Sequence, residues 1–242
     1  MNGSINIGTS GWHYEHWRDP FYPGSLSPEH FLTYYAQYFK TAEVNNTFYH
    51  LPSEKAVAKW RDSTPTGFIF AVKASRYITH VKKLKEPEQS LRLFLKLIKI
   101  LGDKLGPILF QLPPYWHFNL VRLKDFLEML PDDLRYAFEF RDDSWINDST
   151  INLLAEHNIA FCIYDFSGAQ TPKIVTSDLI YIRLHGPEAA YMGQYDTETL
   201  EGWAKEFLAW KQQGKQIYCY FDNDEAGYAA KDALRLKLLT GS

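Results

Sequence analysis

Charged residues two positions apart recur at the ends of short apolar runs in this sequence. Glu139 stands two residues before Arg141, and Arg183 stands two residues before His185. Because side chains alternate across a β-strand, each pair is expected on one face of its strand. Carboxylates and an imidazole beside guanidinium groups can acquire separated pKa values and so transfer protons. The pattern predicts acid–base catalysis by Glu139, His185 and Glu43.

A second group of residues is cationic and has the chemistry of an anion site. Lys73, Arg76 and His80 stand close together in one segment, and Arg141 and Arg183 follow later in the chain. Guanidinium and ammonium groups make strong charge-assisted hydrogen bonds to phosphate and carboxylate. These five residues are therefore predicted to bind an anionic substrate.

Further polar residues follow other apolar runs, and aromatic residues occupy the segments between them. Flat rings suit stacking on a ligand, although each single ring can equally pack as a lid over a core. The remaining predicted substrate-binding residues are Trp12, Asn45, Tyr49, Gln111, Trp145, Asp165 and Asn223.

These residues need elements to position them, and short β-rich runs alternate with longer helical patterns along the whole chain. This alternation is typical of parallel βα units, and eight units favour closure into a barrel. In such a barrel the active site lies at the C-terminal ends of the strands, where the polar residues stand. The predicted fold is an α/β single (β/α)8 TIM barrel over residues 1–242. The predicted strands cover 5–10, 42–46, 68–74, 107–112, 136–140, 160–165, 179–185 and 216–223.

The helical pattern is clearest over residues 87–101, where an apolar stripe recurs with helical spacing. A capped helix with a proline in its first turn is expected to begin at 27–29, and another stripe over 200–210 ends near Gly214. Residues 167–177 show no helical period, so a short or missing helix is expected there.

The composition bounds the class of protein. The chain of 242 residues is 45% hydrophobic and has a net charge of −3, which suits one packed domain without a global positive field. Cys162 and Cys219 stand in apolar runs and are expected to be buried and reduced. The residues show no secretory leader, long apolar span or nucleotide-binding glycine loop. A cytoplasmic location, no membrane partner and no nucleotide cofactor are expected, and the oligomeric state stays open.

Several motifs resemble those of the YecE-like family, domain of unknown function 72. They are GTSGW at 8–12, EVNNTFY at 43–49, FAVKASRYITH at 70–80, QLPP at 111–114, FEFRDDSW at 138–145, YIRLHG at 181–186 and YFDNDEAGYAAKDALRLK at 220–237. The resemblance covers nearly the whole chain. It implies a bacterial β/α barrel with no known reaction and a suggested likeness to endonuclease IV barrels. Asp222 and Asp232 depart from the family pattern, which tends to have Asn there.

Three functions are compatible with these residues. The first is an acid–base hydrolase, lyase or isomerase acting on a small anionic substrate. The second is a metal-dependent phosphodiesterase acting on nucleic acid, in which one or more divalent ions would be ringed by Glu43, Glu139, Asp165, His185 and Asp222. A multi-zinc site, however, usually needs more histidines at strand ends. The third is a non-catalytic binder of nucleic acid or another ligand.

The alternative to all three functions is a purely structural layer of salt bridges that caps the barrel. If Glu139 is catalytic, its change to glutamine is expected to lower activity and leave the fold intact. A large loss of stability with unchanged activity would instead indicate the structural layer.

Overall fold

The computed structural model describes residues 3–166 and 169–242, and eight parallel strands form one curled sheet within this part of the chain. Their order is β1-β9-β8-β6-β5-β4-β3-β2. The strands are β1 (Ser4–Thr9), β2 (Thr41–Val44), β3 (Ile69–Lys73), β4 (Leu105–Leu112), β5 (Tyr136–Phe140), β6 (Ala160–Phe166), β8 (Leu179–Leu184) and β9 (Gln216–Phe221). The TIM-barrel prediction is confirmed, because each predicted strand is present to within a few residues.

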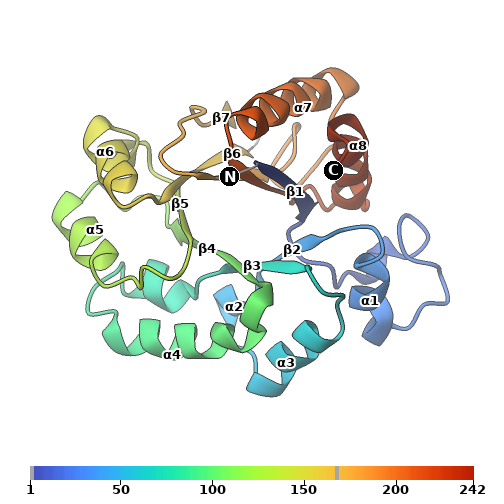
Figure 1. The fold of residues 1–242 in the computed structure, drawn as a ribbon, viewed down its shortest axis with the longest axis horizontal. Helices are drawn as coiled ribbons and strands as arrows, with labels where there is room; N and C mark the ends of the chain where they lie inside the picture. The colour runs from blue at the N-terminus through green and yellow to red at the C-terminus, as the bar shows by residue number, and fades with distance from the viewer. Residues whose placement is uncertain (1–2, 167–168) are drawn as a thin grey trace.

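Helices surround the strands, as Figure 1 shows for α3, α4, α5, α6, α7 and α8. The α-helices are α1 (Phe31–Tyr35), α2 (Asn46–Tyr49), α3 (Glu54–Asp62), α4 (Glu88–Ile98), α5 (Leu120–Leu127), α6 (Asp148–Glu156), α7 (Thr197–Gln212) and α8 (Tyr228–Thr240). Shorter turns are 3-10 at Glu15–Trp17, Pro28–His30, Lys99–Lys104 and Asp143–Trp145, and π at Tyr77–Val81. Within the described ranges, no helix has the length and apolar character needed to cross a membrane.

Three helical predictions need comment. The helix predicted over 87–101 ends at Ile98 and continues as a 3-10 turn, in which Gly102 adopts a φ of 58°. Ser27 does not cap its helix with its side chain, because the chain enters α1 through the turn Pro28–His30 instead. After β6, residues 169–178 form no helix, and the short strand β7 (Ala169–Gln170) pairs antiparallel with β6. Residues 167 and 168 of that predicted segment lie outside the described residues.

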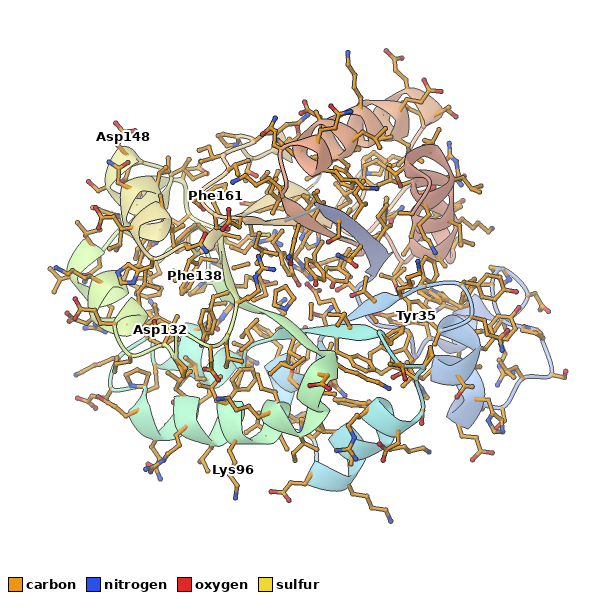
Figure 2. All side chains as sticks on the ribbon, viewed as in Figure 1. Tyr35, Lys96, Asp132, Phe138, Asp148 and Phe161 are labelled. Atoms are coloured by element: carbon orange, nitrogen blue, oxygen red, sulfur yellow. The ribbon has the colours of Figure 1, made fainter. Side chains whose placement is uncertain are left out.

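The two faces of each strand contact different parts of the core. Phe138 and Phe161 belong to the large apolar cluster that also contains the helix residues, and Figure 2 shows them well inside the fold while Lys96 lies on its outside. The alternate residues form a smaller separate cluster that fills the barrel interior. Its members are Ala71, Leu109, Ala137, Ala160, Cys162, Leu179, Tyr181, Tyr218 and Tyr220. On each strand, residues two or four positions away from a member of this inner cluster therefore also point into the barrel.

The barrel closes between β1 and β2, where the ladder is reduced to a single bridge between Ser10 and Glu43. The hydroxyl group of Tyr35, a fully buried residue of α1, fills the gap. It accepts the backbone N–H of Thr9 at 2.9 Å and donates to the carbonyl of Thr41 at 2.9 Å. One side chain thus joins the two strands where backbone pairing is missing.

We expect Tyr35→Phe to lower the free energy of unfolding by about 1–3 kcal/mol, because two buried backbone groups lose their partner. Chemical denaturation followed by circular dichroism measures this difference. Tyr34→Phe, on the same helix but paired at the surface with Tyr38, is the matched control and should be nearly neutral. Equal effects of the two changes would contradict the role given to Tyr35.

Candidate functional site

A fully buried arginine lies at the C-terminal end of the barrel interior. Arg183 of β8 is 1% exposed and contacts carboxylates from three other strands. Its Nη2 lies 2.8 Å from Glu43 Oε1 and 3.2 Å from Asp222 Oδ2, and its Nη1 lies 2.9 Å from Glu139 Oε2. Burial alone would lower the pKa of Arg183, but the three carboxylates outweigh it and raise the pKa well above its ordinary value.

Glu43 is held on every side. Arg183 donates to it through Nε at 3.0 Å as well as through Nη2, and the hydroxyl group of Tyr181 donates at 2.6 Å. Ser10 of the adjoining strand end also donates to Glu43 and accepts from Asn45. With no exposed surface, Glu43 orients Arg183 and closes the seam between β1 and β2.

Glu139 is equally enclosed. It accepts from Nε of Arg141 and from Nη1 of Arg183, and it has no exposed surface. Burial would raise the pKa of its carboxyl group, but Arg141, Arg183, His185 and Lys73 together hold that pKa far below the ordinary value. Glu139 is therefore ionised at any physiological pH, and this state does not suit a general acid.

The hydrogen bonds of His185 define its tautomer. Nδ1 lies 3.0 Å from Asp222 Oδ2 and so donates to that carboxylate, while Nε2 accepts from Arg141 Nη2 at 2.9 Å. Burial and the charge of Arg183 lower the pKa of His185 despite the opposing carboxylates. Burial opposes ionisation of Asp222, but His185 and Arg183 hold its pKa below the ordinary value. His185 is thus a neutral link between a carboxylate and a guanidinium group.

Lys73, at the end of β3, differs from these saturated groups. It is 9% exposed, and its Nζ lies 4.4 Å from the centre of the Phe48 ring. Among residues 3–166 and 169–242, no acceptor is within hydrogen-bond or ion-pair distance of this ammonium group. Burial first, and then repulsion by Arg183, lowers the pKa of Lys73 to about 8, with partial compensation from Glu139, Glu43 and Asp222.

Arg141 is the second cation at the solvent side of the network. Its guanidinium carbon lies 4.5 Å from the ring centres of both Tyr164 and Phe166, which hold the plane in place. Nε and Nη2 are used by Glu139 and His185, whereas Nη1 has no acceptor in the described part of the chain. At 11% exposure, Arg141 can offer this edge to a ligand.

Alternation along the strands explains why these residues meet. Cys162, Tyr181 and Tyr220 line the barrel interior, so the residues two positions further along also point inward. The inward residues at the C-terminal end are Ser10, Glu43, Asn45, Lys73, Gln111, Glu139, Arg141, Tyr164, Arg183, His185 and Asp222. Register places Gln111 beside Glu139 and Tyr164 beside Arg183.

Two predicted binding residues lie on the opposite strand face, toward the helices. Asp165 accepts from the hydroxyl group of Tyr195 at 3.2 Å, and burial raises its pKa. Asn223 donates to Asp232 at 2.8 Å and to the carbonyl of Gly193 at 2.9 Å. The structure therefore separates Asp165 and Asn223 from the Arg183 network, because each is one residue out of phase with the inward positions.

The predicted aromatic residues also divide. Trp145 has no exposed surface and donates to the Trp116 carbonyl at 2.5 Å, so it packs in the core and cannot touch a ligand in this conformation. Trp12 is 8% exposed and packs against Trp60 and Phe70. Tyr49, by contrast, is 63% exposed beyond the strand ends.

The other predicted cations of the Lys73 segment lie outside the network. Arg76 is exposed and has no ion pair within the described residues. His80 is half-buried with its Nδ1 2.9 Å from Thr79 Oγ1, and burial together with Lys73 and Arg76 lowers its pKa to about 4. A neutral His80 cannot add positive charge for an anion near pH 7.

Sequence reasoning missed three members of the network as site residues, namely Ser10, Tyr181 and Tyr164, and it considered Asp222 only as a metal ligand. The alternation of side chains along a strand could have indicated two of these residues. Tyr181 stands two residues before Arg183, and Asp222 stands two residues after the inward Tyr220. Of the two acids that depart from the family pattern, Asp222 supplies a third carboxylate to Arg183, while Asp232 pairs with Arg235 on the outer face.

The carboxylates are not arranged for a metal ion. Across residues 3–166 and 169–242, no group of three or more His, Cys, Asp or Glu side chains is placed to hold one. Glu43 and Glu139 direct their oxygens at Arg183, and Asp165 faces away from them. This donor set gives no support to the metal-ring arrangement considered from the sequence.

The fold and this network define a TIM-type (β/α)8 barrel with a charged, largely buried cluster at its C-terminal end. The chain belongs to the family described as protein of unknown function DUF72, whose model matches residues 6–242. The resemblance found in the sequence motifs is thereby confirmed.

Two of the following three relatives match nearly the whole chain, and the third matches about half of it. The crystal structure of a DUF72 family protein from Thermotoga maritima MSB8 is 31% identical, covers 99% of this chain and 100% of its own, and has a TM-score of 0.89. UPF0759 protein YunF of Bacillus subtilis (strain 168) is 24% identical over 96% of this chain and 93% of its own. UPF0759 protein YecE of Escherichia coli (strain K12) is 32% identical over 46% of this chain and 41% of its own.

We expect Lys73→Met to stabilise the protein by about 1–3 kcal/mol at pH 7, since a buried ammonium without an acceptor becomes an apolar side chain of similar length. Between about pH 8 and the unfolded value of about 10.4, the unfolded chain keeps this proton and the folded chain has released it. The cost of Lys73 therefore falls as the pH rises through that window.

Thermal and chemical denaturation at pH 7 and pH 10 measure this gain, which should shrink at the higher pH. Lys96→Met, on the exposed face of α4, is the control and should change little (Figure 2). Destabilisation by Lys73→Met at pH 7 would show that the ammonium is satisfied.

Glu139→Gln is expected to have the opposite sign and to lower the free energy of unfolding by about 3–5 kcal/mol. The change removes one carboxylate from between Arg141 and Arg183 and leaves buried positive charge uncompensated. This prediction differs from the expectation based on the sequence, in which Glu139→Gln leaves the fold intact. Equilibrium unfolding in urea measures the loss, and a neutral result would mean that Asp222 and Glu43 suffice for both arginines.

Proposed function

We propose that this chain is an enzyme that binds a small carboxylate- or phosphate-bearing substrate at the C-terminal end of the barrel and transfers protons there. The observation that carries this proposal is that Lys73 and Arg141 retain N–H donors without an acceptor in the described chain, while Glu43, Glu139 and His185 are already engaged in hydrogen bonds with one another's partners. A lyase, isomerase or hydrolase reaction fits this chemistry.

The exposure of the side chains supports separate roles for the residues that bind the substrate and for those that only position them. Glu43, Glu139 and His185 have no exposed surface, whereas Lys73, Arg141 and Asp222 are each between 9% and 13% exposed. A ligand entering along the barrel axis therefore meets two cations before it meets the enclosed carboxylates. Arg141, with its plane fixed between two aromatic rings and two hydrogen bonds, is preorganised for a planar carboxylate.

Proton transfer is assigned differently from the expectation based on the sequence. Glu43 and Glu139 position Arg183 and Arg141, because their oxygens are already used by these cations. Lys73 has a pKa of about 8, which allows it to exchange a proton near neutral pH. Asp222 and His185 are assigned as a second proton-transfer group. They are hydrogen-bonded to each other, and Asp222 reaches the solvent side.

A second candidate, a binder of a longer anionic ligand such as single-stranded nucleic acid, is favoured by the rim of the barrel. Tyr49, Tyr115 and Tyr191 are 63%, 88% and 48% exposed on the segments that follow β2, β4 and β8. Exposed rings of this kind can stack on successive bases. Such a ligand would use Tyr49 and Tyr115 in addition to the two cations, so a Tyr49→Ala, Tyr115→Ala variant should weaken it and leave small anions unaffected.

Binding of small anions tests the proposal directly. Malonate or phosphate at about ten times its dissociation constant should stabilise the protein by about 1.4 kcal/mol, seen as a higher melting temperature. Lys73→Met should lose most of this shift, and Lys96→Met should keep it. Absence of any shift at millimolar anion in the unmodified protein would overturn the proposed anion site. Compounds that compete with malonate are then the substrates to assay for turnover.

A further inference from the structure

We propose that Lys73 is a nucleophile that forms an imine with the carbonyl carbon of a small oxo acid, because its largely buried amine packs against the Phe48 ring without an acceptor among the described residues, and Arg141 keeps an unused N–H donor for the carboxylate. This inference rests on the proposed anion-binding function and names its substrate class, an aldehyde or ketone that carries a carboxylate. It also gives Lys73 a covalent role in place of a purely electrostatic one.

The environment of Lys73 differs from that of three other lysines that are at least partly buried, Lys104, Lys215 and Lys237. Lys104 Nζ donates to Thr64 Oγ1 at 3.0 Å, and Lys215 Nζ donates to the Ser177 carbonyl at 3.0 Å. Lys237 donates to the carbonyl of Tyr38. Each of these three ammonium groups thus has an acceptor, whereas Lys73 Nζ has no hydrogen bond within the described ranges and lies 4.4 Å from the centre of the Phe48 ring. A lysine kept for packing or charge alone would gain from an acceptor.

The neighbouring charges favour the reactive form of the amine. The nearby carboxylates of Glu43 and Glu139 accept hydrogen bonds from Arg183, so they offset only part of the effect of burial on Lys73. Desolvation and an adjacent cation are the two means by which proteins activate lysine as a nucleophile. With a pKa of about 8, about one amine in ten is neutral at pH 7, against about one in 2,500 for an ordinary lysine.

The covalent step balances without a further reagent. The lone pair of the neutral Lys73 amine forms a C–N bond to the carbonyl carbon, and the C=O π electrons move to oxygen. That oxygen takes up the proton that the nitrogen gives up, which yields a carbinolamine. The hydroxyl group then leaves with the second N–H proton as water, and the C=N bond forms. Neither oxidation nor reduction occurs.

The surroundings can orient such a substrate. Arg141 has one unused guanidinium edge, and Glu139 contacts Arg141 while it also acts on the charge of Lys73. The carboxylate and the carbonyl of a 2-oxo acid are adjacent, so one small molecule could present its carboxylate to Arg141 and its carbonyl carbon to Lys73. Gln111, which pairs in register with Glu139, supplies an amide on the strand between Lys73 and Glu139.

Reductive trapping tests this assignment. The full-length protein is incubated with glyoxylate and sodium cyanoborohydride, which reduces an imine to a stable secondary amine, and the modified lysine is located by peptide mass spectrometry. We expect Lys73 to be the first lysine modified, at a rate at least about tenfold above that of the exposed Lys96. After normalisation to the reaction of each aldehyde with N-acetyl-lysine, glyoxylate should label Lys73 about tenfold faster than acetaldehyde, which lacks the carboxylate.

Matched variants separate this inference from the proposed function. Lys73→Arg keeps the positive charge but cannot form an imine, so it should keep the malonate shift in melting temperature and lose the fast adduct. If malonate stabilises the protein and Lys73 is not labelled faster than Lys96, the imine is overturned and the anion site stands. If Lys73 is labelled rapidly but malonate gives no shift, the anion site is overturned and the nucleophile stands. Should Lys73→Arg fail to fold, Lys73→Met serves as the non-reactive control.

Discussion

The buried guanidinium group of Arg183 is the constraint on which the C-terminal end of this barrel depends. A charge removed from water must be paired with good geometry, or it destabilises the fold by several kcal/mol. Three carboxylates surround Arg183: Glu43 of β2, Glu139 of β5 and Asp222, which directly follows β9. The pairing is satisfied only when the sheet has closed into a barrel, so the network makes closure a condition for burying these charges.

The same network explains the contrast between saturated and unsaturated groups. Glu43, Glu139 and His185 use nearly all of their hydrogen-bonding capacity on one another and on the two arginines. Burial and Arg183 push Lys73 toward its neutral form, and the carboxylates of Glu139, Glu43 and Asp222 compensate only part of this effect. Such a local cost to stability is common where a protein keeps a group available for chemistry. The hydrogen-bonded cluster around Arg183 stabilises this end of the barrel and so offsets the free-energy cost of Lys73.

The seam between β1 and β2 and the Arg183 network share residues. Glu43 accepts from Ser10 across the seam between β1 and β2, and it also binds Arg183. A few residues away, the hydroxyl group of Tyr35 links Thr9 to Thr41 where the ladder between the same strands is interrupted. The interruption leaves the end of β1 open enough for a side chain to serve as a strand partner. Polar contacts, rather than a continuous ladder, complete the barrel there.

The sequence by itself determined the eight-strand order and most of the inward polar residues, because alternation of apolar and polar positions follows from local backbone geometry. It also placed Glu139, Arg141, Arg183 and His185 at strand ends. Only the tertiary structure decided what each does, since pairing and exposure depend on strands that are distant in the chain. Asp165 and Glu139 are both acids near the end of an apolar strand. A shift of one residue in the strand alternation, however, places Asp165 on the face toward the helices and Glu139 on the face toward Arg183. Burial likewise made Trp145 a core residue and left Lys73 without an acceptor, and neither outcome has a local signature.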